Sequence, residues 1–219
     1  MLEREREQVA ASARRLAALG LTLGTAGNVS MRAGDRILVT PTGAVLEHVR
    51  APEISVVGRD GASLDGPPPT SELALHLGAY DRYGPGAVVH AHAPVATALA
   101  AVLDEVPAVH YQMVELGGPV RVARYETFGT TELARVTLDA MEGRTAVLMA
   151  NHGTLTYGDD LGQAVGRAVL LEWACMVYWR AAAIGAPRAL DERQLDDVRA
   201  QIERRGYGSL LGGEEQPDE

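Results

Sequence analysis

Two histidines one residue apart, His90 and His92, stand in the stretch VVHAHAP within a run of small and β-branched residues. Successive side chains of a strand point to opposite faces, so both imidazoles would share one face while Val89 and Ala91 share the other. Two imidazoles on one face can bind a single metal ion. A chain with six histidines in 219 residues can carry this spacing by chance, so the pattern needs support from elsewhere in the sequence.

That support comes from His152 and Glu72. His152 follows the apolar segment TAVLMAN, predicted as a buried strand, and strand ends often present functional loops from a rigid scaffold. Glu72 lies in the first turn of a helix predicted from about residue 71 to 83. Three imidazole nitrogens and one carboxylate oxygen form a normal zinc shell. The alternative is a set of packed histidines and a glutamate favoured by the helix dipole.

His76 complicates the choice of a fourth ligand. It lies one helical turn after Glu72 and would share its face, so the two could form a competing ligand pair. His76 could equally support a ligand or pack in the core. His48 and His110 stand in predicted loops and are weaker candidates. The pattern of residues alone leaves the fourth ligand open.

Three short stretches could bind an anion: GTAGNVS (24–30), TPTG (40–43) and PTSE (69–72). Glycine allows close backbone approach, the threonine and serine hydroxyls donate hydrogen bonds, and a helix start favours negative charge. Each stretch alone is more often a turn or a helix cap. Thr70 and Ser71 immediately precede Glu72, so a phosphate held there would lie near the metal. The sequence has no Walker-type or dinucleotide-binding fingerprint.

Composition excludes several other classes. The formal charge of −9 argues against binding to a nucleic-acid backbone. The N-terminal residues MLEREREQ carry charges where a leader peptide needs an apolar run, and no uncharged window is long enough to span a membrane. We therefore expect a cytoplasmic protein with neither nucleic acid nor membrane as partner.

The elements that must position these residues follow from hydrophobic periodicity and turn signals. We expect helices at 2–19, 71–83, shortly after 92, 130–141, 161–183 and 190–205, and strands at 28–32, 36–40, 54–58, 87–92 and 145–153. Thr130 or Thr131 would cap its helix. Helices and strands interleave, which predicts an α/β or α+β fold around a central sheet.

Seven motifs together resemble the class II aldolase/adducin-like family: GNVSMR, TPTG, PTSELALH, VVHAHAP, PAVHY, FGT and ANHGTL occur in the family's order. The resemblance runs from about residue 5 to 207. It implies an αβα sandwich around a mainly antiparallel sheet, with residues 1–207 as one catalytic domain and 208–219 as a flexible acidic tail. It also implies a homotetramer with active sites at subunit interfaces.

The resemblance assigns roles to individual residues. One zinc ion per subunit, or Mn²⁺ or Co²⁺ in its place, would be held by His90, His92, His152 and Glu72, and His76 would not be a ligand. The phosphate would be bound by Gly27, Asn28, Thr42, Gly43, Thr70 and Ser71. Tyr111 would serve the aldehyde oxygen across a subunit boundary, and Tyr207 resembles a mobile C-terminal tyrosine of the same enzymes.

The implied activity is cleavage of a ketose 1-phosphate, such as L-fuculose 1-phosphate, to dihydroxyacetone phosphate and a small aldehyde such as L-lactaldehyde. Glu72, released from the metal by substrate, would handle the proton on the donor carbon, and Tyr111 the proton of the C4 hydroxyl. Alternatives on this scaffold are a sugar-phosphate decarboxylase, a dehydratase, and a 4-epimerase, whose acidic catalytic residue has no counterpart in VPAVHYQMVELGG. A non-catalytic adducin-like scaffold is disfavoured because all four candidate ligands are present.

Overall fold

A computed structural model describes residues 2–206, within which the strands form one nine-stranded sheet in the order β4-β3-β2-β1-β5-β9-β8-β7-β6. The strands are β1 Asn28–Ala33, β2 Arg36–Val39, β3 Ser55–Gly58, β4 Ser63–Asp65, β5 Ala87–Ala91, β6 Glu105–Val106, β7 Val120–Ala123, β8 Ala146–Met149 and β9 Gly153–Gly158. Every neighbouring pair is antiparallel except β7 and β8, which are parallel. The prediction of a mainly antiparallel sheet is confirmed.

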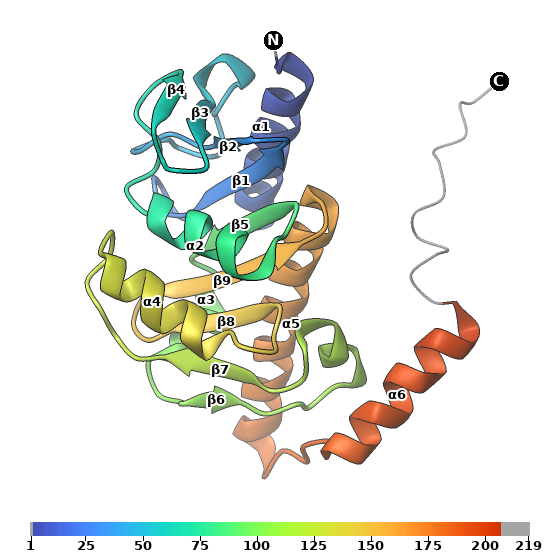
Figure 1. Ribbon diagram of the computed structural model, residues 1–219. Coiled ribbons are helices and arrows are strands. Elements are labelled where there is room, and N and C mark those ends of the chain that lie inside the picture. The colour runs from blue at the N-terminus through green and yellow to red at the C-terminus, as the bar shows by residue number, and fades with distance from the viewer. Residues whose placement is uncertain (1, 207–219) are drawn as a thin grey trace, which may run out of the picture.

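Helices cover both faces of this sheet (Figure 1). They are α1 Glu3–Ala18, α2 Leu73–Tyr83, α3 Pro94–Ala100, α4 Thr131–Ala140, α5 Leu161–Ile184 and α6 Glu192–Arg205, with 3₁₀ turns η1 Ala51–Glu53 and η2 Tyr111–Leu116. Helices α2 and α4 lie side by side on the near face in Figure 1, α1 and α5 lie on the far face, and α6 extends away from the sheet. The layers are those of the predicted αβα sandwich.

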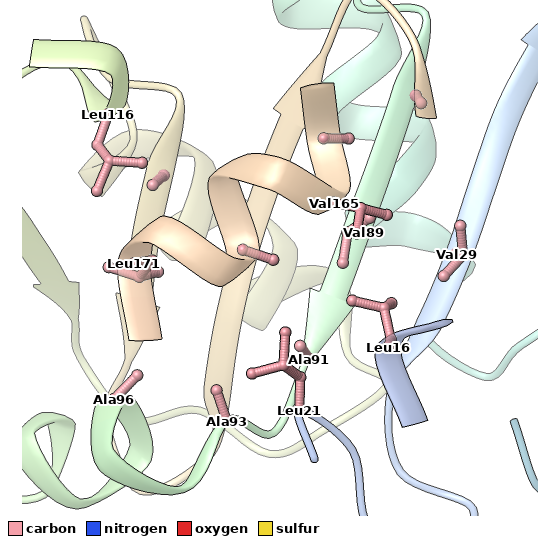
Figure 2. Packing of buried hydrophobic residues seen from close by; sticks show 14 of the residues in the cluster. Leu16, Leu21, Val29, Val89, Ala91, Ala93, Ala96, Leu116, Val165 and Leu171 are labelled. Carbon is pink, nitrogen blue, oxygen red and sulfur yellow. The ribbon is translucent and has the colours of Figure 1, made fainter. Parts of the chain in front are cut away.

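The larger hydrophobic core lies between the sheet and α1 and α5 (Figure 2). Leu16 of α1, Leu171 of α5, and Val89 and Ala91 of β5 are all fully buried in this core. Val88, the intervening residue of β5, belongs instead to the core under α2 and α4. This alternation confirms that the two sides of β5 face different layers, with the His90 side turned toward α2.

The strand expected at 145–153 is shorter, because a turn at 150–152 ends it and leads into a further strand. β8 ends at Met149, and β9 begins at Gly153 between β5 and β8. β9 was not predicted, because its buried positions include Thr154 and Thr156, which weaken the apolar signal. Their hydroxyls donate to the carbonyls of Ala91 and Ala164 at 3.3 and 3.0 Å, which offsets the cost of burying them.

The helix boundaries agree closely with expectation. α2 begins at Leu73 rather than Ser71, which leaves Glu72 at the position just before the helix. The Thr130 hydroxyl accepts a hydrogen bond from the backbone N–H of Leu133 at 3.1 Å, so Thr130 is the cap of α4. No helix in residues 2–206 combines the length and apolar character needed to cross a bilayer. The predicted tail at 208–219 lies outside the described residues.

Candidate active site

Three segments that are distant in sequence converge beyond the end of β5. His90 is in the strand, His92 follows its last residue, and His152 lies in the turn between β8 and β9. Asn151 enters this turn with a left-handed φ of 54°, a conformation that asparagine tolerates better than most residues. Glu72 approaches from the start of α2 on the same side of the sheet. Antiparallel pairing places the start of β9 beside the end of β5, so both histidine segments meet at the same end of these two central strands.

The four side chains form one compact cluster. A single ligand atom from each of Glu72, His90, His92 and His152 can be chosen so that all four atoms lie within 4.8 Å of one another. The ring centroids of the three imidazoles are 4.8, 4.9 and 5.0 Å apart, and the rings cross at 70–77°. His90 Nε2 lies 3.0 Å from both His92 Nε2 and Glu72 Oε2. Because the ring nitrogens point toward a common centre, the arrangement suits binding of one shared cation better than it suits simple packing of three rings.

Two further contacts fit this cluster to a metal ion. His90 Nδ1 donates to the carbonyl of Thr154 at 2.9 Å, which leaves Nε2 as the atom facing the cluster. Glu72 Oε1 is buried without a hydrogen-bond partner and lies 3.3 Å from His152 Nε2. A buried carboxylate oxygen is costly to leave unpaired. Three nitrogens and one oxygen match the ligand set of zinc and suit other divalent ions as well.

The ionisation states reflect the same crowding. Burial alone would raise the pKa of Glu72, but the imidazoles of His152 and His90 beside the carboxylate outweigh it and hold this pKa well below its usual range. Burial, with the positive charges of His90 and His152 next, lowers the pKa of His92 to about 4. The site therefore presents a carboxylate to whatever positive charge occupies it, whether imidazolium protons or a divalent ion.

A cavity of about 450 Å³ opens directly onto the cluster. Its lining includes Glu72, His92 and His152 together with all six residues predicted to bind phosphate: Gly27, Asn28, Thr42, Gly43, Thr70 and Ser71. An isolated β-bridge between Pro41 and Pro69 holds the predicted anion-binding stretches TPTG (40–43) and PTSE (69–72) side by side. The structure thus brings the metal candidates and the phosphate candidates into one pocket.

Gly27 illustrates why a glycine is required in this wall. Its φ of +89° is rare for any residue with a side chain. A Cβ there would also lie 2.8 Å from Cγ2 of Thr22 and 3.1 Å from the carbonyl oxygen of His90. The backbone beside the cluster can approach a ligand only because this position has no side chain.

The charge of the pocket is unusual for an anion site. No lysine or arginine stands among the described residues that line it, whereas Glu72 and Glu126 do. Arg124 pairs with Glu126 at 3.0 Å and so neutralises one of the two carboxylates. An anion would be held by neutral hydrogen-bond donors, and a divalent cation in the cluster would supply the remaining positive charge.

Thr25, Ala26 and Pro41, from the predicted anion-binding stretches, also line the pocket, whereas four lining residues were given no role from the sequence: Tyr125, Glu126, Phe128 and Asn151. Tyr125, Glu126 and Phe128 come from the loop that joins β7 to α4, and Phe128 is the first residue of the motif FGT. The motif supported the family resemblance but received no role. The aromatic residues of this loop, Tyr125 and Phe128, were the available signal, because large apolar side chains on a loop are often functional; in the structure they are 59% and 67% exposed.

The remaining candidates are not in this pocket. Tyr111 begins η2, is 52% exposed and does not line the cavity of its own chain, so its action across a subunit boundary stays a prediction. His110 caps η2, and His48 is exposed; neither joins the cluster. His76 is fully buried and is not one of the four clustered ligands. Tyr207 lies outside the described residues.

Comparison with known proteins identifies the family of the fold and site. The model of the family described as Class II Aldolase and Adducin N-terminal domain matches residues 7–179. The chain belongs to this family. Class II aldolases depend on a metal ion, in agreement with the cluster of one glutamate and three histidines.

Individual class II aldolases resemble the chain along most of its length. A 5-methylthioribulose-1-phosphate/5-deoxyribulose-1-phosphate aldolase of Rhodospirillum rubrum is 39% identical over 202 residues, or 91% of each chain. A 5-deoxy-D-ribulose 1-phosphate aldolase of Bacillus thuringiensis serovar kurstaki is 34% identical over 212 residues, covering 95% of this chain and 99% of that one. A solved structure of L-fuculose 1-phosphate aldolase, 33% identical, superposes with a TM-score of 0.87 over 90% of this chain and 95% of that chain. The chain is accordingly a class II aldehyde-lyase.

Proposed function

We propose that the protein is a zinc-dependent aldolase that cleaves a ketose 1-phosphate to dihydroxyacetone phosphate and a small aldehyde. The observation that carries this proposal is the single pocket onto which both the cluster and the predicted phosphate-binding residues open. A ketose 1-phosphate carries its phosphate on C1, next to the C2 carbonyl and close to the C3–C4 bond that breaks. The phosphate and the reacting carbons must therefore be bound within one small cavity. The cavity volume of about 450 Å³ is within the usual range for a small-molecule site.

The metal-binding role falls to His90, His92, His152 and Glu72. When bound there, a divalent ion would act as a Lewis acid that withdraws electron density from the ketose carbonyl. Zinc is preferred because three imidazoles and one carboxylate form one of its ordinary ligand sets. Elemental analysis of protein purified without added metal tests this choice directly.

Proton transfer at the donor carbon falls to Glu72. Its carboxylate is buried at the floor of the pocket, and its low pKa keeps it ionised and able to accept a proton. In the cleavage direction, the bond between C3 and C4 breaks, its electron pair remains on the donor fragment, and a proton must be added to C3. In the synthesis direction the Glu72 carboxylate would remove that proton from C3; in cleavage Glu72 would take up a proton from solvent and deliver it to C3. Tyr111 of a neighbouring subunit would exchange the proton of the C4 hydroxyl.

The phosphate would be bound by hydrogen bonds rather than by ion pairs with side chains. Thr70 and Ser71 precede α2, where the helix dipole favours an anion, and their hydroxyls can donate hydrogen bonds to it. Thr42 and Gly43 line the same pocket from the neighbouring stretch. Neutral donors of this kind can select a phosphate by their geometry, and the positive charge that attracts the phosphate would come from the metal ion.

For the aldehyde we favour a fragment with an apolar end, which makes 5-deoxyribulose 1-phosphate the first substrate to test. Tyr125 and Phe128 line the pocket and suit a methyl group. The relatives of 39% and 34% identity are named for that substrate. L-Fuculose 1-phosphate, whose aldehyde product carries a hydroxyl, is the second. The four-fold homotetramer and the cytoplasmic location remain predictions.

The test separates the two half-reactions. Metal-loaded protein is incubated with dihydroxyacetone phosphate in D₂O, and loss of the C3 proton is followed by NMR, with Glu72→Gln and a chelator as controls. Stereospecific exchange that both controls abolish would support the aldolase, and acetaldehyde against L-lactaldehyde would then be compared as acceptors. No exchange by protein shown to contain metal would overturn the proposal in favour of a decarboxylase, dehydratase or epimerase.

A further inference from the structure

Two regular rows of polar side chains meet beneath the cluster. Glu72, His76 and Tyr80 are spaced by four residues along one face of α2, and Asn28 and Ser30 are spaced by two along one face of β1. The Tyr80 hydroxyl lies 2.8 Å from Ser30 Oγ, which lies 2.7 Å from His76 Nδ1. His76 Nε2 lies 2.5 Å from Asn28 Oδ1, and Asn28 Nδ2 lies 3.1 Å from Glu72 Oε2. The four contacts form one unbranched chain of hydrogen bonds, the relay, that ends on the carboxylate.

The relay is shielded from solvent along its whole length. Ser30 and His76 are fully buried, and the other three members are at most 7% exposed. Hydrogen bonds in such a site have no water to replace them if a partner is removed. A chain of buried polar groups of this length is expensive to maintain without a role, because apolar residues would fill the same space at lower cost.

Chemistry fixes the direction of every bond in the relay. The carboxylate of Glu72 accepts, so the Asn28 amide must present its NH₂ to it and its carbonyl oxygen to His76. That carbonyl can only accept, so His76 Nε2 carries the ring proton. Burial, with the charge of His90 next, lowers the pKa of His76 to about 3, which keeps the ring neutral. Its bare Nδ1 then accepts from the Ser30 hydroxyl, which in turn accepts from Tyr80.

We infer that this one-directional relay is a positioning device that holds the Glu72 carboxylate in place for proton transfer, with His76 as its central residue. The inference rests on the proposed aldolase function. Glu72 Oε1 faces His152 and has no hydrogen-bond partner, so Oε2 is the oxygen by which the neutral part of the site restrains this side chain. A base that also serves as a ligand must keep its orientation when its surroundings change, and Asn28 provides a contact independent of the metal.

His76 is the residue at which the relay can be broken without touching the pocket, because His76 does not line it. His76→Leu removes both ring nitrogens at similar volume, whereas His76→Gln retains an N–H that can reach Asn28. Thr137→Val is the matched control: Thr137 is also fully buried on the same side of the sheet, in α4, and its hydroxyl has no partner.

Proton exchange on dihydroxyacetone phosphate is the functional readout. We expect His76→Leu to lower kcat for exchange about tenfold or more while KM and metal content stay within about twofold of wild type, because a hydrogen bond that positions a charged group is lost. His76→Gln should recover most of the rate, and Thr137→Val should match wild type. Equal rates in His76→Leu and wild type, or equal losses in His76→Leu and His76→Gln, would overturn the inference.

A spectroscopic readout tests the relay without catalysis. In ¹⁵N-histidine-labelled protein, His76 is assigned by its absence from His76→Gln, and we expect its proton on Nε2 with a hydrogen-bonded, bare Nδ1. Ser30→Ala should shift the Nδ1 resonance toward that of a nitrogen without a donor. A proton found on Nδ1 would overturn the inference even if all variants exchange normally. Wild-type protein without exchange but with the expected tautomer would contradict the aldolase proposal and leave the relay intact.

Discussion

The two faces of strand β5 have different surroundings, although both faces are formed by alternate residues of the same five-residue strand. Val89 and Ala91 pack against α1 and α5 in the larger hydrophobic core (Figure 2). On the other face, His90 joins the metal-binding cluster, above the relay formed by β1 and α2. The first face supplies burial of apolar area, and the second holds polar groups that are buried at a cost. The difference indicates that burial in the large core offsets the cost of burying the polar layer.

If the two faces are functionally separate, removing a metal ligand should abolish activity but not folding. We expect His92→Ala to lower proton exchange about a thousandfold or more, since a Lewis acid contributes several kcal/mol to such a reaction. The half-buried imidazole makes little contact with the large core, so the far-UV circular dichroism should match wild type. Metal content and exchange rate measure the effect. A folded, metal-free variant with wild-type exchange would break the comparison.

The converse change is made in the large core. Leu171 of α5 is fully buried, and Leu171→Ala should lower the free energy of unfolding by about 2–5 kcal/mol through lost burial and the cavity left behind. Urea denaturation of the metal-free protein measures it. Exchange per folded molecule should stay near wild type. A fall in exchange larger than the fall in folded fraction would show that the core also sets the geometry of the site.

Gly153, at the start of β9, lies where the two regions meet. A Cβ there would lie 2.4 Å from the carbonyl oxygen of Ala91, 3.2 Å from Cδ2 of His92 and 3.3 Å from Cε1 of His90. We expect Gly153→Ala to cost about 1–3 kcal/mol of stability by forcing the strands apart. Because the same shift displaces two ligands, metal affinity should fall as well, and isothermal titration with Zn²⁺ would detect it. A loss of stability with unchanged affinity for Zn²⁺ would show that Gly153 matters for packing of the core and not for the geometry of the ligands.

A pH dependence of stability also belongs to the polar face. The pKa of His76 is lowered to about 3 from an ordinary value of 6.5, mainly by burial. The unfolded chain therefore binds this proton more readily, and the stability present above pH 6.5 is lost as pH falls from 6.5 toward 3. One such group contributes a slope of about 1.4 kcal/mol per pH unit in that window. Urea denaturation of metal-free protein at several pH values should show a flatter profile for His76→Leu than for wild type.

Local sequence patterns predicted much of this architecture. The strand containing His90, the helix after Glu72 and the cap at Thr130 all follow from alternation, periodicity and capping preferences. The central strand β9 did not, because its threonines hide its burial, and only pairing with β5 and β8 makes it a strand. Tertiary context decides such a segment, and no local signal reports that context.

The site divides in the same way. The types and spacing of His90, His92, His152 and Glu72 suggested a cluster, but the exclusion of His76 came from family resemblance rather than from spacing. Its partners, Asn28 and Ser30, lie 46 to 48 residues away, and nothing local links them to α2. The pocket residues of the loop between β7 and α4 were missed for the same reason: only folding places this loop over the cluster.

The two rows that build the relay also restrict the length of the chain. One residue inserted between Glu72 and His76 would rotate everything after it by about 100° around the axis of α2. His76 and Tyr80 would then leave β1 together, although neither lines the pocket. Natural or engineered variants should accept insertions in the turns on either side of α2 far more readily than within residues 72–80. For this stretch, the number of residues is as much a part of the active site as their identity.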